Sequence, residues 1–214
     1  MTEIAPMAKS YRSVPRRSSG FSLLEILVTL VILLLGLLGL VGMQARATSA
    51  SMEAYQRAQA LILVNQMVDV IRANRRVGTC FAFSNDTVGT PFIGTAGAGY
   101  AAPPACTVST AAENQSALDA ITGWDAFLQG AAESLAGGSV GAMIGARGCI
   151  SYLAGSELSS PSGPLTGTGV YTVSVSWQGL VDSVVPADNC ANNLYGNETQ
   201  RRTMSVSFRL GRVN

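Results

Sequence analysis

The sequence contains one long apolar run, from Phe21 to Met43, with a single acid, Glu25, near its start. The 18 residues from Ile26 to Met43 include only one polar side chain, that of Thr29. As a helix at about 1.5 Å per residue they extend about 27 Å, close to the ~30 Å hydrocarbon core of a bilayer. A charged side chain at the centre of a membrane costs roughly 3 kcal/mol on insertion scales. The run therefore predicts a membrane-spanning helix whose carboxylate needs a partner.

The residues before the run are basic and end in a glycine. The first 20 residues hold four basic side chains, including Arg16 and Arg17, against one acidic side chain. Such a cationic flank favours retention on the cytoplasmic side of a membrane. If the chain is cut after Gly20, the new amine of Phe21 lies about a turn from Glu25. Between staggered subunits, that amine and that carboxylate can neutralise each other.

Two simpler interpretations of the run exist. A secretory signal peptide has a shorter apolar stretch followed by a small-residue cleavage site, and Ala45-Arg46-Ala47 resembles such a site. The run is long for that purpose. A simple membrane anchor is the other interpretation, but an anchor would not need Glu25.

The composition argues against catalysis and against nucleic-acid binding. Charged residues make up 13% of the chain and the net charge is +1, which gives no electrostatic case for nucleic acid. The chain has no histidine, no Gly-x-Ser-x-Gly, no phosphate-binding loop and no paired-carboxylate signature. We therefore expect no enzyme, no cofactor and no metal site. Asp182 and Asp188 lie in a polar stretch, where lone acids are expected to be solvated.

All four cysteines, Cys80, Cys106, Cys149 and Cys190, follow the apolar run. With the basic end inside, they face an oxidising compartment, where an even number indicates two disulfides. Three pairings are possible, and we favour the sequence-local one, Cys80–Cys106 with Cys149–Cys190. A zinc site is the weaker alternative, because there is no Cys-x-x-Cys and no histidine.

The helix is predicted to continue to residue 77. Residues 44–76 lack proline and are rich in helix-favouring side chains. An apolar stripe is predicted at 3-4-3 spacing, formed by Leu61, Val64, Val68 and Ile71. Residues 78–110 are predicted to be an irregular connection. A second helix is predicted around 112–135, with Trp124, Phe127, Leu128, Ala131 and Leu135 on its buried face and Gly137-Gly138 as its end.

The last third of the chain alternates apolar and polar residues. Strands are predicted at 171–177 and 204–210, with a third around 149–152 and a weaker fourth at 140–144. Such alternation favours an antiparallel sheet with one face covered by the amphipathic half of the first helix and one face wet. A polar excursion between Trp177 and Arg201 contains Cys190. A Cys149–Cys190 bond would tie this excursion to the sheet.

The stretch Gly20-Phe21-Ser22-Leu23-Leu24-Glu25 before an apolar helix resembles the class III leader of type IV pilins and of type II secretion pseudopilins. The resemblance implies that a prepilin peptidase cuts between Gly20 and Phe21 and methylates the amine of Phe21, and that Glu25 acts in subunit assembly. It also implies an α+β fold shaped like a lollipop, with a long N-terminal helix, its first half transmembrane, packed on an antiparallel sheet.

A closer likeness is to minor pilins of the PilV group, the type IV pilus modification proteins. It rests on the residues of 23–32, on Tyr171–Trp177, on Cys190, on 194–198 and on Arg201-Arg202. Gly42 stands where many major pilins have proline, so no pronounced kink is implied there. Proteins of this group are associated with a minor-pilin complex that primes pilus assembly and can cap the tip.

The resemblance divides the chain into a cleaved leader (1–20), a transmembrane and assembly half of the helix (21–43), an amphipathic half (44–77) and a periplasmic head (78–214). It implies a single pass through the inner membrane with a cytoplasmic N-terminus, and later an extracellular pilus. The implied partners are the prepilin peptidase, inner-membrane lipid, the assembly platform, the major pilin and other minor pilins, and a tip adhesin. A type II secretion pseudopilin, and an adhesive or DNA-uptake pilin, are the alternatives.

Overall fold

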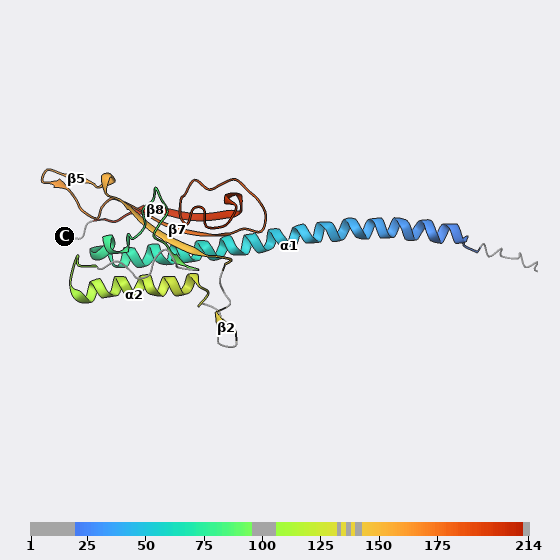
Figure 1. Cartoon of the computed structure of the whole chain (residues 1–214), viewed down its shortest axis with the longest axis horizontal. Coiled ribbons are helices and arrows are strands. Elements are labelled where there is room, and N and C mark those ends of the chain that lie inside the picture. The colour runs from blue at the N-terminus through green and yellow to red at the C-terminus, as the bar shows by residue number, and fades with distance from the viewer. Residues whose placement is uncertain (1–19, 96–105, 132–133, 136–137, 140–142, 212–214) are drawn as a thin grey trace, which may run out of the picture. The chain divides into compact units, whose positions relative to one another are not determined.

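The computed structural model describes residues 20–95, 106–131, 134–135, 138–139 and 143–211 (Figure 1). The basic leader with Arg16 and Arg17 lies outside this part of the chain. The chain forms two compact units, Met1–Ala47 and Thr48–Asn214, which we call the N-terminal unit and the head. The long helix α1 (Leu23–Ala73) contributes to both units.

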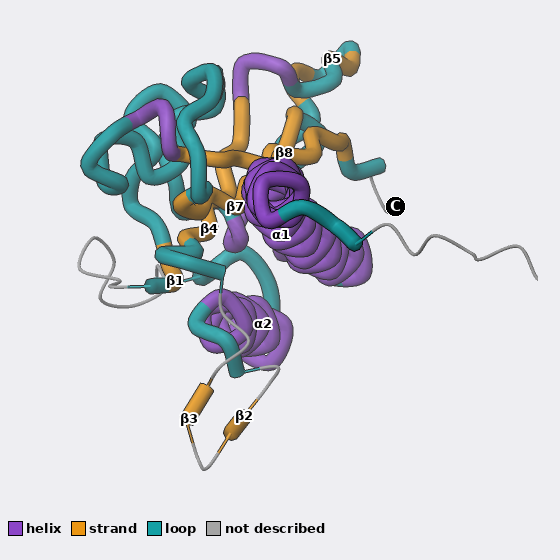
Figure 2. Tube along the Cα trace, turned by 90° about the vertical axis from the view of Figure 1, so that its right-hand side faces the viewer, coloured by secondary structure: helices purple, strands orange, loops and turns teal. Residues whose placement is uncertain are grey.

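The head contains a four-stranded antiparallel sheet in the order β1-β4-β7-β8 (Figure 2). Its strands are β1 (Ile93–Gly94), β4 (Arg147–Leu153), β7 (Val170–Gln178) and β8 (Arg201–Arg209). The second helix is α2 (Ala111–Leu128), and the shorter elements are η1 (Arg75–Phe81), η2 (Ala154–Ser156), η3 (Glu198–Gln200) and the hairpins β2 (Ser134–Leu135) with β3 (Gly138–Ser139) and β5 (Ser159–Ser160) with β6 (Gly163–Pro164).

The second half of α1 packs into the core with the sheet and α2. Its buried side chains include Ala60, Val64, Met67, Val68 and Ile71. They share one hydrophobic cluster with the inward-facing residues of β7 (Tyr171, Val173, Val175 and Trp177) and with Ile121, Trp124 and Leu128 of α2. This arrangement confirms the predicted α+β fold, in which a long N-terminal helix packs on an antiparallel sheet.

One member of the predicted stripe is wrong. Leu61 is 43% exposed, whereas Ala60 is completely buried. Helical residues at spacings of four and seven share a face, so Ala60, Val64, Met67 and Ile71 form the buried stripe. The larger Leu61 lies one residue, or about 100°, to the side of it.

Both predicted helix ends are too late along the chain. Helix α1 stops at Ala73 rather than at residue 77. Directly after its end, the Asn74 Nδ2 donates to the carbonyl of Val70 at 2.9 Å, and the tighter helix η1 follows. Helix α2 stops at Leu128, because Gly130 adopts a left-handed φ of 89° that ends the helix. Ala131, which was predicted to be buried, lies beyond the end of the helix and is exposed. Phe127 was also predicted to be buried, but it lies within the helix to the side of the buried residues Trp124 and Leu128, and it is 36% exposed. Gly138 lies in β3 instead of ending a helix, and Gly137 and the side chain of Leu135 lie outside the described residues.

Three of the four predicted strands correspond to β4, β7 and β8, but the predicted fourth is wrong in its described part. Met143 and Ile144 are not in a strand, and 140–142 lie outside the described residues. The fourth strand is β1, in the predicted irregular connection, where Ile93 pairs with Gly148. The Asp125 carboxylate of α2 accepts from the backbone N–H of Gly94 at 2.6 Å, which anchors this short strand through a side chain distant in sequence.

We predict that Gly148→Ala destabilises the head by about 1–3 kcal/mol, because small-to-large changes in a packed core force its neighbours to move. A Cβ at this position would lie 2.6 Å from Leu128 Cδ1 and 2.6 Å from Trp124 Cη2. Chemical denaturation of the full chain in detergent, followed by tryptophan fluorescence, measures the change. Gly155→Ala is the matched control, since a Cβ at Gly155 meets nothing within 4 Å. Equal stabilities of the two variants would contradict the packing argument.

Candidate functional site

Helix α1 begins immediately after the predicted cleavage point. The backbone N–H of Glu25 donates to the side-chain oxygen of Ser22 at 3.2 Å and to its carbonyl at 3.0 Å, so Ser22 caps the helix. Glu25 therefore lies in the first turn. The unpaired N–H groups at a helix N-terminus carry partial positive charge, which attracts a carboxylate.

The residues on both sides of the predicted cleavage point are accessible in the N-terminal unit. Phe21 is 78% exposed, and Gly20 and Glu25 are exposed. A Cβ placed at Gly20 would meet no atom of the described part of the chain within 4 Å. These three residues lie within six positions of one another: Gly20 and Phe21 precede the helix, and Glu25 lies in its first turn.

The first part of α1 exposes apolar side chains on every side. Between Leu23 and Met43 all the large apolar side chains are at least 46% exposed. Glu25 is the one ionisable side chain of 23–43. The other polar side chain, that of Thr29, donates its hydroxyl proton to the carbonyl of Ile26 at 2.8 Å. Apolar surfaces larger than a few hundred Å² mark membrane or protein interfaces. Within the described residues, α1 is the one helix long and apolar enough to cross a membrane.

Two disulfides fasten the loops of the head. One joins Cys80 to Cys106, with 5.4 Å between the Cα atoms, and it connects η1 to the segment before α2. The other joins Cys149 of β4 to Cys190, with 5.8 Å between the Cα atoms. The second disulfide attaches the loop 179–200, which follows β7, to the sheet.

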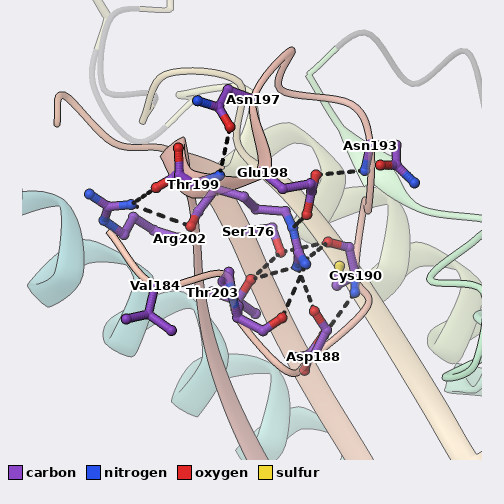
Figure 3. A network of polar contacts seen from close by, with 12 residues as sticks. Ser176, Val184, Asp188, Cys190, Asn193, Asn197, Glu198, Thr199, Arg202 and Thr203 are labelled. Atoms are coloured by element: carbon purple, nitrogen blue, oxygen red, sulfur yellow. Dashed lines mark hydrogen bonds and ion pairs between the residues drawn. The ribbon is translucent and has the colours of Figure 1, made fainter. Parts of the chain in front are cut away.

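A buried arginine at the start of β8 organises the same loop. Arg201 is 1% exposed, and its Nε donates to the Glu198 carboxylate at 2.6 Å. Its Nη1 donates to the backbone carbonyls of Asp188 at 2.5 Å and Cys190 at 3.4 Å. Figure 3 shows the polar network in which Asp188, Cys190 and Glu198 lie. Its Nη2 donates to the carbonyl of Pro186 at 3.3 Å. One guanidinium thus fixes three loop carbonyls and one carboxylate.

The loop covers the polar face of β7, so the prediction of a wet face is wrong along part of this strand. Ser174 and Ser176 are 3% and 0% exposed. The Ser176 hydroxyl donates to the Cys190 carbonyl at 2.9 Å, and the Ser174 hydroxyl donates to the Asp188 carboxylate at 2.5 Å. Asp188 is therefore a structural acceptor and not a solvated lone acid, whereas Asp182 is exposed as predicted.

A second arginine connects the loop to α1 within the head. The Arg202 Nη2 donates to the Glu53 carboxylate at 3.2 Å, and the side chains of the two residues are only 6% and 17% exposed. The same oxygen of Glu53 accepts from the backbone N–H groups of Leu180 at 3.2 Å and Val181 at 3.4 Å. Glu53 is not among the residues that the sequence patterns predicted to be functional. A signal for it exists, because it is the only acid between residues 26 and 68.

Tyr195 anchors the end of the loop. Its hydroxyl donates to the Gly145 carbonyl at 3.0 Å, and the Arg147 guanidinium lies 4.7 Å from the centre of its ring. Burial raises the pKa of Tyr195 to about 12, so this hydroxyl stays protonated and able to donate at neutral pH. Within the described parts of the chain, no group of three or more His, Cys, Asp or Glu residues could hold a metal ion.

Two segments of the chain match known families. Residues 15–41 match the prokaryotic N-terminal methylation motif, which spans the predicted cleavage point and Glu25. Residues 42–117 match the Tt1218-like family, described as type IV pilin Tt1218. No curated protein and no solved structure matches the chain in these comparisons.

We predict that Arg202→Gln and Glu53→Gln each destabilise the head by about 3–5 kcal/mol, because each leaves a buried charge without its partner. The double variant should lose much less than the sum of the two, which a double-mutant cycle from denaturation curves measures. Arg72→Gln is the control. Its side chain is 55% exposed and pairs with Asp69 at 3.6 Å, and such surface pairs contribute only about 0–1 kcal/mol. Additive losses would contradict direct pairing of Glu53 with Arg202.

Proposed function

We propose that this chain, which has the prepilin methylation motif and a type IV pilin segment, is a minor pilin that primes pilus assembly and is incorporated at the tip with other minor pilins. The observation that carries the proposal is Glu25, the one ionisable group on the exposed apolar surface of 23–43, in the first helical turn after Gly20 and Phe21. Such a surface needs either lipid or the helices of other subunits around it. A minor pilin has both environments in turn.

The minor role is supported by the likeness of the head to the PilV group. The resembling residues Tyr171–Trp177 form most of β7, and Arg201 and Arg202 are the buried arginines that hold the loop 179–200. The likeness thus falls on the core strand and on the polar contacts that shape the head.

The first step is insertion into the inner membrane. The basic leader (1–20) stays in the cytoplasm, residues 21–43 cross the bilayer, and residues 44–77 and 78–214 enter the periplasm. That compartment is oxidising, which suits the bonds Cys80–Cys106 and Cys149–Cys190.

The second step is processing by the prepilin peptidase. The enzyme cuts between Gly20 and Phe21 and methylates the freed amine of Phe21. Both residues are exposed, and no atom of the described residues lies within 4 Å of a Cβ placed at Gly20, which supports a bond that is open to a protease.

The third step is extraction from the membrane into the fibre by the assembly platform. The Glu25 carboxylate attracts the Phe21 amine of an adjacent subunit, either the major pilin or another minor pilin. Leaving either charge buried and unpaired costs about 3–5 kcal/mol, so a subunit at the wrong stagger is rejected. The pair therefore fixes subunit register more than it adds net stability. The mature chain then lies in an extracellular pilus, where a tip adhesin is a further partner.

We predict that the mature protein begins at Phe21 and carries one methyl group on its amine, which intact-mass spectrometry of the membrane fraction measures. Gly20→Val should leave the uncut precursor, because the added side chain disturbs the recognised bond. Gly42→Ala should be processed normally, since Gly42 is equally open, with nothing within 4 Å, but distant from the bond. A mature chain that begins at any other residue would refute the cleavage proposal.

We predict that Glu25→Gln fails to restore assembly in a strain from which the gene has been deleted, because the amide cannot neutralise the amine. Immunoblots of sheared fibres and counts of surface pili measure incorporation and assembly. Thr29→Val is the control, one turn along the helix, where the hydroxyl donates to the backbone carbonyl of Ile26 in the same helix.

The same strains separate a pilus role from a secretion role. Loss of surface pili with normal protein secretion supports the minor-pilin proposal. Loss of secretion with normal pili would instead identify a pseudopilin. Full activity of Glu25→Gln would contradict the pairing of Glu25 with the amine.

A further inference from the structure

A hollow of about 370 Å³ lies in the head at the C-terminal end of α1. Its walls come from four separate segments: η1, the residues before α2, the loop before β7, and the residues after β8. Arg75 and Arg76 line one side, and the Ser109 and Thr168 side chains line the others. Tyr171, whose hydroxyl donates to the Gly167 carbonyl at 3.2 Å, forms part of the wall.

Among the residues that the structure describes, those that line this hollow include two arginines and no acid. Arg75 is exposed, and it forms no ion pair or side-chain hydrogen bond with any residue that the structure describes. Arg76 is 68% exposed in its side chain, and its Nη1 lies 3.5 Å from the Glu113 carboxylate. The positive charge on this wall is therefore only partly balanced.

Glu113 lies outside this hollow and is held from the other direction. Both the Ser109 and the Thr110 hydroxyls donate to its Oε2, and these hydrogen bonds, that from Ser109 foremost, lower the pKa of the carboxyl. A second hollow of about 300 Å³ has Glu113 in its lining and shares Arg75 and Arg76 with the first. Arg75 and Arg76 thus line both hollows, and Glu113 lines only the second of them.

A purely structural role explains part of this arrangement. Cations at the C-terminus of a helix interact favourably with its dipole, and Arg75 and Arg76 follow the end of α1 directly. That role does not require a hollow between four segments, and it does not require an unpaired Arg75.

We propose that the hollow binds a small ligand through an oxyanion group, phosphate or carboxylate, held by Arg75 and Arg76. The planar guanidinium presents parallel N–H donors that match two oxygens of either group. Val108 and Leu210 supply apolar surface for the rest of the ligand. The site belongs to the head and is independent of the N-terminal processing and pairing.

The test uses inorganic phosphate and glucuronate as separate probes of the full chain in detergent. Thermal unfolding and isothermal titration calorimetry are carried out against chloride at constant ionic strength, because salt screens exposed charges. A ligand that binds only the folded state raises the melting temperature. We expect this rise with at least one probe, and which probe is the stronger identifies the oxyanion as a phosphate or a sugar carboxylate.

Variants distinguish the site from general charge effects. Arg75→Gln should weaken binding about tenfold, since it removes a charge-assisted contact. Glu113→Gln should strengthen it by freeing Arg76, while keeping a side chain that can bond to Ser109 and Thr110. Arg57→Gln is the control, since Arg57 is also exposed on α1 but does not line the hollow. No response of the unmodified chain to either probe, or equal losses in Arg75→Gln and Arg57→Gln, would overturn the proposal.

Discussion

Helix α1 is constrained by the different surfaces it presents in the two units. In residues 60–71 it buries one stripe of side chains, and the core of the head forms around that stripe. In residues 23–43 it exposes apolar side chains in all directions, and no other described residue of the chain covers them. A helix of that composition is stable only in lipid or among other helices. The environment of the N-terminal unit must therefore be supplied by something else.

Polar contacts and a disulfide hold the loop 179–200 on the head. The loop 179–200 has few apolar side chains facing inward, so burial alone would not fix it. Arg201 binds its carbonyls, Glu53 accepts from its N–H groups, and Cys190 attaches it to β4. Because each of these groups is buried or nearly so, removing one partner leaves the other unsatisfied, which makes the arrangement specific to one loop conformation.

Periodic sequence patterns predicted helices and strands well where one face of the element is buried along its length. The alternation in 171–177 and 204–210 identified β7 and β8, and the stripe of Val64, Val68 and Ile71 identified the face of α1 that meets the sheet. The failures have specific causes. The two-residue strand β1 is too short to show alternation and depends on Asp125, and α2 ends at a glycine seven positions before the predicted glycine pair. The burial of Ser174 and Ser176 depends on a loop that no local pattern places there.

The sequence by itself determined the N-terminal features, because they are consecutive in the chain: Gly20, Phe21, Glu25 and the apolar run need no long-range contact to be recognised. It also indicated the α+β class, since helical and strand periodicity are local properties. Only the tertiary structure decided that Glu53 meets Arg202, that Asp188 serves as an internal acceptor, and that Arg75 and Arg76 border a hollow. Such partners lie far apart in the chain, up to 149 residues for Glu53 and Arg202, and only the packing of the core brings them within hydrogen-bonding distance.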